Sequence, residues 1–484
     1  MKYLILINNA PKMITYHKGL GDSLKRKGNS VIYAFADELP LLTYSMDFSK
    51  ERIYIFSEYF KVNDKNPLID NKYSKINWLK TYFSDYDRNR YYSGPTYDNK
   101  YYDSLLKNLI NFFDTIFQNE NIDFFIYEAI SNSFAYVCYE VAKVNDIGYR
   151  GYIGSRIANR FELHTEEFGM TNRFEKIFKN SSFHAQTPEI KDFVESYLAK
   201  YLGNHIPSYL ARKNKLTADY SLVKKYINNE KSLLLKGAFK FYKKTKSADF
   251  KYAYQSNNPI KYYYNLFKRN ILKKIRTTIG NNIFEKPAKD EIYYLFPLHM
   301  KPEASTSVLA RHYCDDLAVL RNIAFNLPIG EKLYIKEHFV NYGNLPLSFY
   351  HELKRIPNVR LIHSNEDTMQ LIKNCKALIT LTSTMGFEAL LMYKKVIVFG
   401  NVFYKCHPNC IKLDSYENLF NILTELKQPP CDREVARNFV TAYYLCTSEG
   451  RTGFSNYEKE DIGRFAEPLI KAIEIYNHEL ATQN

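Results

Sequence analysis

The chain has 484 residues, of which 45% are apolar and 25% charged, and its net charge is +15. This is the composition of a globular protein and excludes an intrinsically disordered chain. A chain of this length is too long for one hydrophobic core, so we expect two domains.

The sequence predicts neither a membrane span nor a secreted protein. The opening KYLILINNA has a short apolar core without a small-residue cleavage site, and no window reaches the roughly 18 apolar residues of a span. The seven cysteines are irregularly spaced, which favours reduced thiols over a disulfide framework. We therefore expect a cytoplasmic protein. Cys406, His407 and Cys410 lack a second ligand pair, so we expect no metal site.

The first part of the chain predicts alternating strands and helices. In chain order we expect a strand at 2–8, a helix at 13–28, a strand at 30–36, a helix at 104–120, a strand at 123–128 and a helix at 131–148 with Ser131 as a possible N-cap. The Tyr-rich stretch from about 45 to 110 has no clear period and is predicted to be irregular. The pattern indicates the start of a Rossmann-like domain.

The positive charge of the chain lies in one segment. Between Arg212 and Lys286 there are 19 Lys and Arg residues but four Asp and Glu residues, an excess that equals the +15 of the whole chain. Aromatic and aliphatic residues alternate with these cations, among them Phe239, Phe241, Tyr242, Leu266 and Phe267. We interpret the pattern as a basic amphipathic helix on an anionic membrane, with a nucleic-acid surface and a plain solvated helix as the alternatives.

A second series of alternating elements follows the basic segment. We expect strands at 291–298, 331–338, 358–363, 376–382 and 395–400, with helices at 307–328, 347–356, 366–375 and 386–393 between them. Short connections in such a series are typical of a parallel sheet covered on both faces. The predicted fold is α/β with two Rossmann-like doubly wound domains facing a cleft and a helical basic insertion.

The predicted domain boundaries follow from this pattern. We assign 1–288 to an N-terminal Rossmann-like domain with the basic insertion at about 205–288, and 289–460 to a C-terminal Rossmann-like domain. A last helix at 461–484 is expected to pack back on the N-terminal domain.

Polar side chains follow three strands of the second domain. His299 and Glu303 follow the first strand, Lys336, Glu337 and His338 end the second, and Thr382, Ser383, Thr384 and Gly386 lie between the fourth strand and its helix. In open α/β sheets ligands bind at the carboxyl ends of strands, and a helix N-terminus with hydroxyl groups suits an anion. The alternative for each residue alone is ordinary turn or capping chemistry. Neither a GxxxxGK[ST] nor a GxGxxG motif is present.

Several segments of the second domain resemble one family. PLHMKPEAST, LYIKEH, FYHELKRIPNVRLI, LITLTSTMGFEALL and VIVFGNVFY are similar, in order and spacing, to the C-terminal half of the capsule polysaccharide biosynthesis glycosyltransferases related to bacterial Kdo transferases. The resemblance covers about 291–405 and is much weaker before that. It implies a GT-B fold, metal-independent transfer with retention, and a CMP-activated 3-deoxy-ulosonic acid as donor, with no further cofactor.

The resemblance also implies roles for particular residues. In similar enzymes the His of a His-Pro motif and a Ser/Thr pair contact the donor phosphate, which carries over to His338, Ser383 and Thr384; this chain has Phe339 in place of the proline. In GT-B enzymes an acidic residue near this place in the chain often binds the nucleotide ribose, a role that carries over to Glu388. Charge develops on the leaving phosphate, so we expect N–H groups, hydroxyls and a cationic imidazole to stabilise it.

Transfer also requires a carboxylate near the anomeric carbon, as a base or a nucleophile. We expect it from the first domain, and choose Glu128 ahead of Asp22 and His17. The predicted function is transfer of an acidic sugar to a growing surface polysaccharide by an enzyme peripheral to the inner membrane. The alternatives are a transferase using a UDP-sugar or CDP-polyol donor, and a non-catalytic basic scaffold that binds lipid or nucleic acid.

Overall fold

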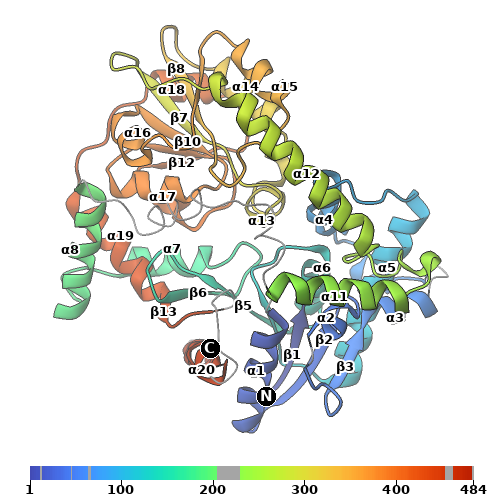
Figure 1. Cartoon of the computed structure of the whole chain (residues 1–484). Coiled ribbons are helices and arrows are strands. Elements are labelled where there is room, and N and C mark those ends of the chain that lie inside the picture. The colour runs from blue at the N-terminus through green and yellow to red at the C-terminus, as the bar shows by residue number, and fades with distance from the viewer. Residues whose placement is uncertain (11–12, 45, 64–66, 204–228, 453–461, 482–484) are drawn as a thin grey trace. The chain divides into compact units, whose positions relative to one another are not determined.

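The computed structural model describes the chain apart from residues 11–12, 45, 64–66, 204–228, 453–461 and 482–484 (Figure 1). Its contacts divide the chain into two units, Met1–Met170 with Ser221–Asn265 and Cys446–Asn484, and Thr171–Tyr220 with Leu266–Leu445. The predicted boundary at residue 288 is therefore wrong, because residues 266–288 belong to the second unit and residues 446–452 to the first.

Unit 1 is built on a seven-stranded sheet with the order β13-β6-β5-β4-β1-β2-β3. Five of these strands are parallel, and β6 and β13 join antiparallel at one edge. The strands are β1 (Lys2–Ile7), β2 (Ser30–Phe35), β3 (Arg52–Ile55), β4 (Phe124–Glu128), β5 (Gly148–Gly154), β6 (Arg160–His164) and β13 (Thr447–Glu449). The order of the parallel strands, 3-2-1-4-5, is that of a Rossmann fold, and the chain changes direction between β1 and β4.

Helices follow the strands of unit 1. They are α1 (Met13–Arg26), α2 (Leu39–Thr43), α3 (Phe56–Val62), α4 (Leu79–Tyr92), α5 (Asn99–Glu120), α6 (Ser133–Val144), α11 (Asn229–Lys244) and α20 (Ile462–Ala481). The stretch 45–110, predicted to be irregular, contains β3, α3, α4 and the start of α5. The prediction failed because β3 has four residues and its place is set by pairing with β2.

The C-terminal helix α20 packs against α1 within unit 1. Ala466, Leu469 and Ile473 share a buried cluster with Leu20 and Leu24. The burial of this apolar face, rather than local propensity alone, fixes the position of the helix.

Unit 2 has a six-stranded parallel sheet with the order β12-β11-β10-β7-β8-β9. The strands are β7 (Tyr293–Pro297), β8 (Lys332–Lys336), β9 (Val359–Ile362), β10 (Ala377–Thr380), β11 (Val396–Val398) and β12 (Cys410–Lys412). This is the Rossmann order 3-2-1-4-5-6, with the change of direction between β7 and β10. The predicted pair of Rossmann-like domains is confirmed.

The helices of unit 2 lie on both faces of its sheet. They are α7 (Thr171–Asn180), α8 (Pro188–Leu202), α13 (Ala304–Ser307), α14 (Asp316–Ala324), α15 (Leu347–Lys354), α16 (Thr368–Asn374), α17 (Thr384–Leu391), α18 (Leu419–Thr424) and α19 (Arg433–Cys446). The helix predicted at 307–328 is α14 alone, because Asp315 caps its N-terminus through the N–H groups of Leu317 and Ala318.

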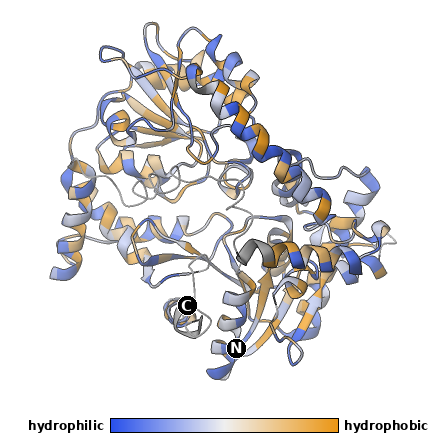
Figure 2. Cartoon of the chain, in the orientation of Figure 1, coloured by the Kyte–Doolittle hydropathy of each residue, from blue (hydrophilic) through white to orange (hydrophobic). Residues whose placement is uncertain are grey.

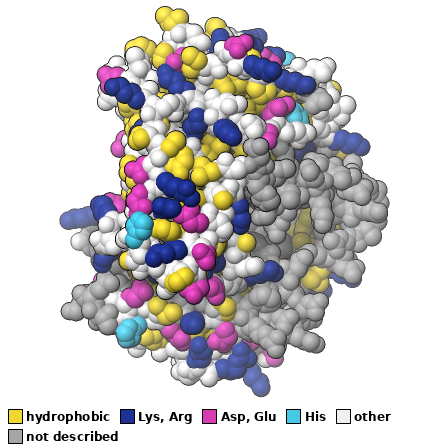
Figure 3. All heavy atoms as spheres, turned by 90° about the vertical axis from the view of Figure 1, so that its left-hand side faces the viewer, with side chains coloured by type: hydrophobic (Ala, Val, Ile, Leu, Met, Phe, Trp, Pro, Cys, Tyr) yellow, Lys and Arg dark blue, Asp and Glu magenta, His cyan; other side chains and the backbone are white. Residues whose placement is uncertain are grey.

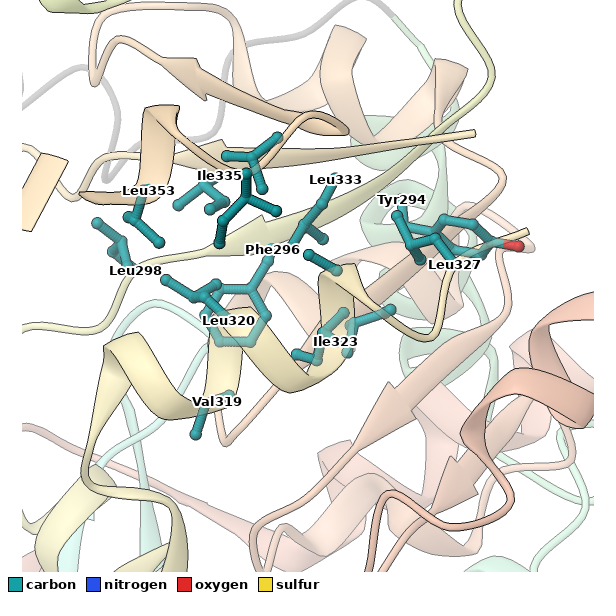
Figure 4. Packing of buried hydrophobic residues seen from close by; sticks show 14 of the residues in the cluster. Tyr294, Phe296, Leu298, Val319, Leu320, Ile323, Leu327, Leu333, Ile335 and Leu353 are labelled. Carbon is teal, nitrogen blue, oxygen red and sulfur yellow. The ribbon is translucent and has the colours of Figure 1, made fainter. Parts of the chain in front are cut away.

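The core of unit 2 lies between the sheet and its helices. Phe296 and Ile335 of neighbouring strands pack with Leu320 and Ile323 of α14 and Leu353 of α15 (Figure 4). The strands are apolar along their length (Figure 2), as expected for a parallel sheet buried on both faces. A rigid sheet of this kind holds the polar residues at its strand ends in fixed positions.

One long helix contributes residues to both units. Helix α12 (Pro259–Ile279) belongs to unit 1 up to Asn265 and to unit 2 from Leu266. Among the described residues, no helix combines the length and the apolar character needed to cross a membrane.

Candidate active site

The strand ends β7 and β10 of unit 2 meet at the change of chain direction, where Rossmann folds bind ligands. His299, two residues after β7, is buried, and its Nε2 accepts a hydrogen bond from the Thr382 N–H at 3.2 Å. The Thr380 hydroxyl lies 3.2 Å from the same nitrogen. His299 therefore holds the loop between β10 and α17 in place.

The chemistry of His299 differs from that of a phosphate ligand. Burial, followed by the charges of Lys301 and His338, lowers the pKa of His299 to about 3. The imidazole is therefore neutral at pH 7, and the nitrogen that faces the loop accepts a hydrogen bond rather than donating one. We reassign His299 from ligand binding to positioning of the loop.

The hydroxyl residues of this loop have separate tasks. Thr382 is buried and donates from Oγ1 to the Ser305 carbonyl at 2.8 Å, which excludes it as a ligand in this conformation. Ser383 is the N-cap of α17, and its Oγ accepts the Met385 N–H at 3.1 Å. Its hydroxyl proton remains free to donate. Thr384, the first residue of the helix, is exposed. Ser383 and Thr384 therefore form an open helix N-terminus suited to an anion.

Gly386 is required for the packing behind this N-terminus. A Cβ atom at Gly386 would lie 2.4 Å from the Tyr404 hydroxyl oxygen, which itself donates to the Ser383 carbonyl at 2.7 Å. The glycine thus lets Tyr404 approach and fix the cap residue. We place Gly386 in support of the site rather than in contact with ligand.

His338, half-buried after β8, is oriented by its neighbours. Its Nδ1 accepts the Val340 N–H at 3.3 Å, so in the neutral ring the proton is on Nε2, which is the donor. Burial, followed by the charges of Lys336 and Lys273, lowers the pKa of His338 to about 4. The expected cationic imidazole is therefore neutral in the free protein at pH 7, and it acts as an N–H donor.

The residues before His338 hold this loop. Glu337 is buried, accepts the His338 N–H at 2.6 Å and also accepts the Tyr350 hydroxyl. Burial raises the pKa of Glu337 to about 7. Lys336 is buried too, and its ammonium donates to the Ser364 carbonyl at 2.8 Å. Lys336 acts on the site through its charge, as its effect on the pKa of His338 shows.

The two predicted carboxylates of unit 2 lie in different places. Glu303 is half-buried, accepts the Ser305 hydroxyl at 3.0 Å, and precedes α13 beside the loop that Thr382 contacts. Burial raises the pKa of Glu303. Glu388 is buried in the second turn of α17, so it does not present its carboxylate to solvent for a ribose.

In unit 1, Glu128 ends β4 next to the change of chain direction. Asn8, which follows β1, donates to Glu128 Oε1 at 2.9 Å and to the Tyr127 hydroxyl at 2.8 Å. Asn132 donates to the same hydroxyl at 2.7 Å. The Tyr127 phenol oxygen thus accepts two amide donors, while the Ser131 hydroxyl is a second donor to Glu128 Oε1, at 3.5 Å.

The environment of Glu128 suits a catalytic base or nucleophile. Burial is the main cause that raises its pKa to about 7, while the charge of Arg88 and the hydrogen bonds from Asn8 and Ser131 act in the opposite direction. A carboxylate with a pKa near neutrality is half ionised at pH 7 and has more basicity than an exposed one. Sequence reasoning missed Asn8, although it follows a strand directly, which is the signal that identified Glu128.

Asp22 and His17 lie away from Glu128 along α1. Asp22 is in the third turn of the helix and pairs with Lys18 at 2.5 Å. His17 is fully buried, its Nε2 lies 2.7 Å from the Tyr152 hydroxyl, and burial lowers its pKa to about 3. Neither is placed among the contacts of Glu128 in the described part of the chain. Ser131, predicted as a cap of the next helix, is replaced in that task by Asn132, whose Oδ1 accepts the Ala135 N–H.

In the part of the chain that the structure describes, no group of three or more His, Cys, Asp or Glu side chains could hold a metal ion. His407, considered with Cys406 and Cys410, is buried, and its Nδ1 accepts the Asn409 N–H at 3.0 Å.

We expect replacement of His299 by Leu to destabilise unit 2, because it leaves the buried Thr382 N–H without its acceptor, a loss of about 1–3 kcal/mol. Thermal unfolding of the variant should begin at a lower temperature. Because the His299 imidazole stays neutral between pH 5 and 8, its titration should not change the nucleotide affinity of the wild type in this pH range. A wild-type step in that range that disappears in His299→Leu would restore the ligand role.

The fold and this site define a protein with two Rossmann-like units, one of which carries a helix N-terminus with open hydroxyl groups at its change of chain direction. Residues 205–408 match the family described as capsule polysaccharide biosynthesis protein. The predicted resemblance is thus confirmed, and the match also includes the whole basic segment, where the motifs had shown little likeness. Among curated proteins, no relative is found.

The solved structures that match this chain have low sequence identity and low TM-scores. The beta Kdo 2,7 transferase of Thermosulfurimonas dismutans KpsC is 11% identical, with 76% of this chain and 89% of that chain covered and a TM-score of 0.34. Its beta Kdo 2,4 transferase is 15% identical, with 72% and 88% covered and a TM-score of 0.37. The UDP-GlcNAc 2-epimerase of Neisseria meningitidis is 12% identical, with 98% and 99% covered and a TM-score of 0.28. No inference about function rests on these likenesses.

Proposed function

We propose that the protein is a metal-independent glycosyltransferase that transfers an acidic 3-deoxy-ulosonic sugar from a CMP-activated donor to a growing capsular or surface polysaccharide, with retention. The observation that carries the proposal is the open N-terminus of α17 at the change of chain direction, inside the residues that match the capsule family. No other cofactor is part of the proposal.

The chemistry follows from the donors around that helix. As the bond between sugar and phosphate breaks, negative charge grows on the phosphate oxygens. The Ser383 hydroxyl, the N–H groups at the start of α17 and His338 Nε2–H are donors that stabilise this charge. They are held by Tyr404 and by Val340, so little reorganisation is needed during the reaction.

Glu128 supplies the carboxylate in this proposal. As a nucleophile it would attack the anomeric carbon, displace CMP and form a glycosyl ester that the acceptor hydroxyl then replaces. As a base it would remove the proton of that hydroxyl. The retention implied by the resemblance favours the nucleophile. Asn8 holds the carboxylate in either role.

A different nucleotide donor is the second candidate. Phe339 follows His338 where similar enzymes have proline, and hydroxyls at a helix start suit any phosphate, so a UDP-sugar or CDP-polyol donor also fits the residues. A non-catalytic scaffold would bind no nucleotide at this site.

A thermal-shift screen distinguishes these candidates. We expect CMP to raise the melting temperature above the effects of CDP, UDP, GDP and ADP, because a ligand at 100 times its Kd stabilises the folded state by about 2.7 kcal/mol. The shift should disappear in Ser383→Ala and persist in Ser348→Ala, an exposed serine of α15. Selective stabilisation by UDP or CDP would replace the CMP donor, and no shift with any nucleotide would contradict the enzyme.

We also propose that the enzyme works at the cytoplasmic face of the inner membrane as a peripheral protein, where a lipid-linked acceptor is reached. The basic segment 212–286 is the proposed contact with anionic lipid. Residues 212–228 lie outside the described residues, so the structural support comes from 229–286.

A further inference from the structure

Helix α12 is the most basic element in the described part of the segment. It contains six Lys and Arg residues and no Asp or Glu. The face in Figure 3, by contrast, mixes Lys and Arg with Asp and Glu among its coloured side chains. Mixed charge is ordinary for a solvated surface, whereas cations alone suit an acidic partner.

From Leu266 on, where α12 belongs to unit 2, its polar side faces the body of that unit. Lys273 Nζ donates to the Val340 carbonyl at 2.6 Å, and Arg276 donates to the Asn344 carbonyl at 2.8 Å. Between these contacts Gly343 has φ +80°, and a Cβ there would lie 2.7 Å from the Lys273 carbonyl oxygen. Close backbone approach and two cationic hydrogen bonds thus fix which side of the helix faces inward.

The apolar side of α12 faces outward as a result. Six of its exposed apolar side chains recur every three or four residues and so form one stripe, which we call the α12 stripe: Ile260, Tyr264, Phe267, Ile271, Ile275 and Ile279. Tyr262 is exposed too but lies off the stripe. Exposure ranges from 38% for Ile271 to 64% for Tyr264. Helices of soluble proteins normally turn such a stripe toward the core, so α12 is inverted.

Exposed lysines border the stripe on both sides. At 100° per residue, Lys274 lies on one side of the stripe, and Lys261 and Lys268 lie on the other. An apolar stripe between two rows of cations matches a bilayer surface, where acyl chains lie beneath anionic phosphates.

The neighbouring helix α11 has a mixed pattern, because Leu235, Phe239 and Tyr242 are exposed while other apolar side chains of the helix are buried. Phe241, expected to insert into lipid, is buried with Phe250 and Ala253 in a cluster of unit 1. Gly237 lies so close to Thr43 that a Cβ would clash with it. Lys244 pairs with Glu38 at 2.7 Å. The predicted insertion of Phe241 is therefore wrong, since this residue is part of the folded core.

We propose that α12 is the membrane-binding element, lying in the plane of an anionic lipid surface with the α12 stripe inserted between the headgroups. The inference rests on the proposed membrane location and assigns it to one helix face. Lys261, Lys268 and Lys274 contact lipid phosphates, while Lys273 and Arg276 hold the helix on unit 2. Salt screens the lysine contribution but not the apolar insertion.

Co-sedimentation of the full chain with vesicles tests this assignment. With 30% phosphatidylglycerol in phosphatidylcholine, we expect wild type to bind, and the triple variant Phe267→Ser, Ile271→Ser and Ile275→Ser to lose at least about tenfold in partitioning. The matched control replaces Val62, Phe325 and Ile329, which are exposed apolar residues elsewhere, by Ser and should bind normally. Pure phosphatidylcholine should bind the wild type weakly.

The cationic border is tested in the same assay. Lys261→Glu, Lys268→Glu and Lys274→Glu together should abolish binding at 0.1 M salt, while Lys373→Glu and Lys427→Glu, also exposed, should reduce it little. Equal binding of wild type and the stripe variant, or no binding by either, overturns the proposal. The proposal is also overturned if sedimentation velocity shows that the wild type self-associates and the stripe variant does not, while vesicle binding is the same for both. That result would assign the stripe to a contact with a second copy of the chain.

Turnover with a soluble acceptor separates this inference from the proposed function. The stripe variant should retain the wild-type rate in solution. If vesicle binding depends on the stripe but the wild type shows no transfer activity, the proposed glycosyltransferase function is wrong and the membrane-binding role of α12 stands. If the wild type is active but does not bind vesicles, the membrane-binding role is wrong and the proposed function stands.

Discussion

Replacement of Glu128 by Gln is expected to reduce transfer by about 10³-fold or more while leaving nucleotide binding unchanged. Gln keeps the size of the side chain but removes the basicity and the nucleophilicity that the reaction needs, and positioned general bases alone contribute about 10²–10⁴-fold. Single-turnover transfer and the nucleotide thermal shift measure the two effects separately.

Asp22→Asn is the matched control for this variant. Asp22 is an acidic residue of the same unit that already pairs with Lys18 on the side of α1, so its loss should change transfer little. Normal transfer by Glu128→Gln together with failure of Asp22→Asn would show that the catalytic carboxylate had been chosen wrongly.

The pH dependence gives a second measurement on Glu128. Its pKa of about 7 lies above that of an exposed glutamate, so the active carboxylate form is lost as the pH falls through 7. The rate should therefore decrease about tenfold per pH unit below that value. Asn8→Leu removes a hydrogen bond that favours the ionised form, which should move the acid limb to higher pH. An unchanged limb would mean that another group controls it.

His338→Ala and Ser383→Ala are each expected to lower turnover by about 10²–10³-fold. Ser383→Ala should also lower stability by about 1 kcal/mol, because its hydroxyl caps α17. Both side chains present donors to charge that grows on the leaving phosphate, and removal of one such donor typically has this effect. Turnover should be measured at saturating donor, so that a change in kcat is separated from a change in KM.

Two exposed residues of α15 serve as controls for these variants. His351→Ala and Ser348→Ala remove the same groups from the surface of unit 2 and should retain wild-type turnover. Activity of His338→Ala and Ser383→Ala within a few-fold of wild type would exclude both residues from the site.

The sequence was sufficient for the elements that carry their own periodicity. The strands β1, β4, β7 and β10 are mostly apolar runs that alternate with helical patterns, and their order along the chain predicts a Rossmann topology without any contact being known. The same reasoning located Glu128 and Ser383, because a polar residue at a strand end or helix start is visible in one dimension. The family resemblance at 291–405 is local as well.

Only the tertiary structure decided what each polar residue does. His299 and His338 look alike in the sequence. In the structure, however, His299 Nε2 accepts a hydrogen bond from the Thr382 N–H, whereas His338 Nδ1 accepts the Val340 N–H and its Nε2–H is left as a donor. Thr382 and Ser383 are likewise neighbours with different partners. These roles depend on contacts between residues distant in sequence, which no local pattern contains.

The same distinction applies to the basic segment. Its charge and its aromatic residues are properties of the sequence, and they indicate an acidic partner such as a membrane. The sequence does not show which side of each helix is free, because this depends on what the rest of the fold covers. Phe241 is buried in the core of unit 1, while Lys273 turns inward to the Val340 carbonyl and leaves Ile271 exposed, since packing and hydrogen bonding with distant residues determine the orientation of both helices.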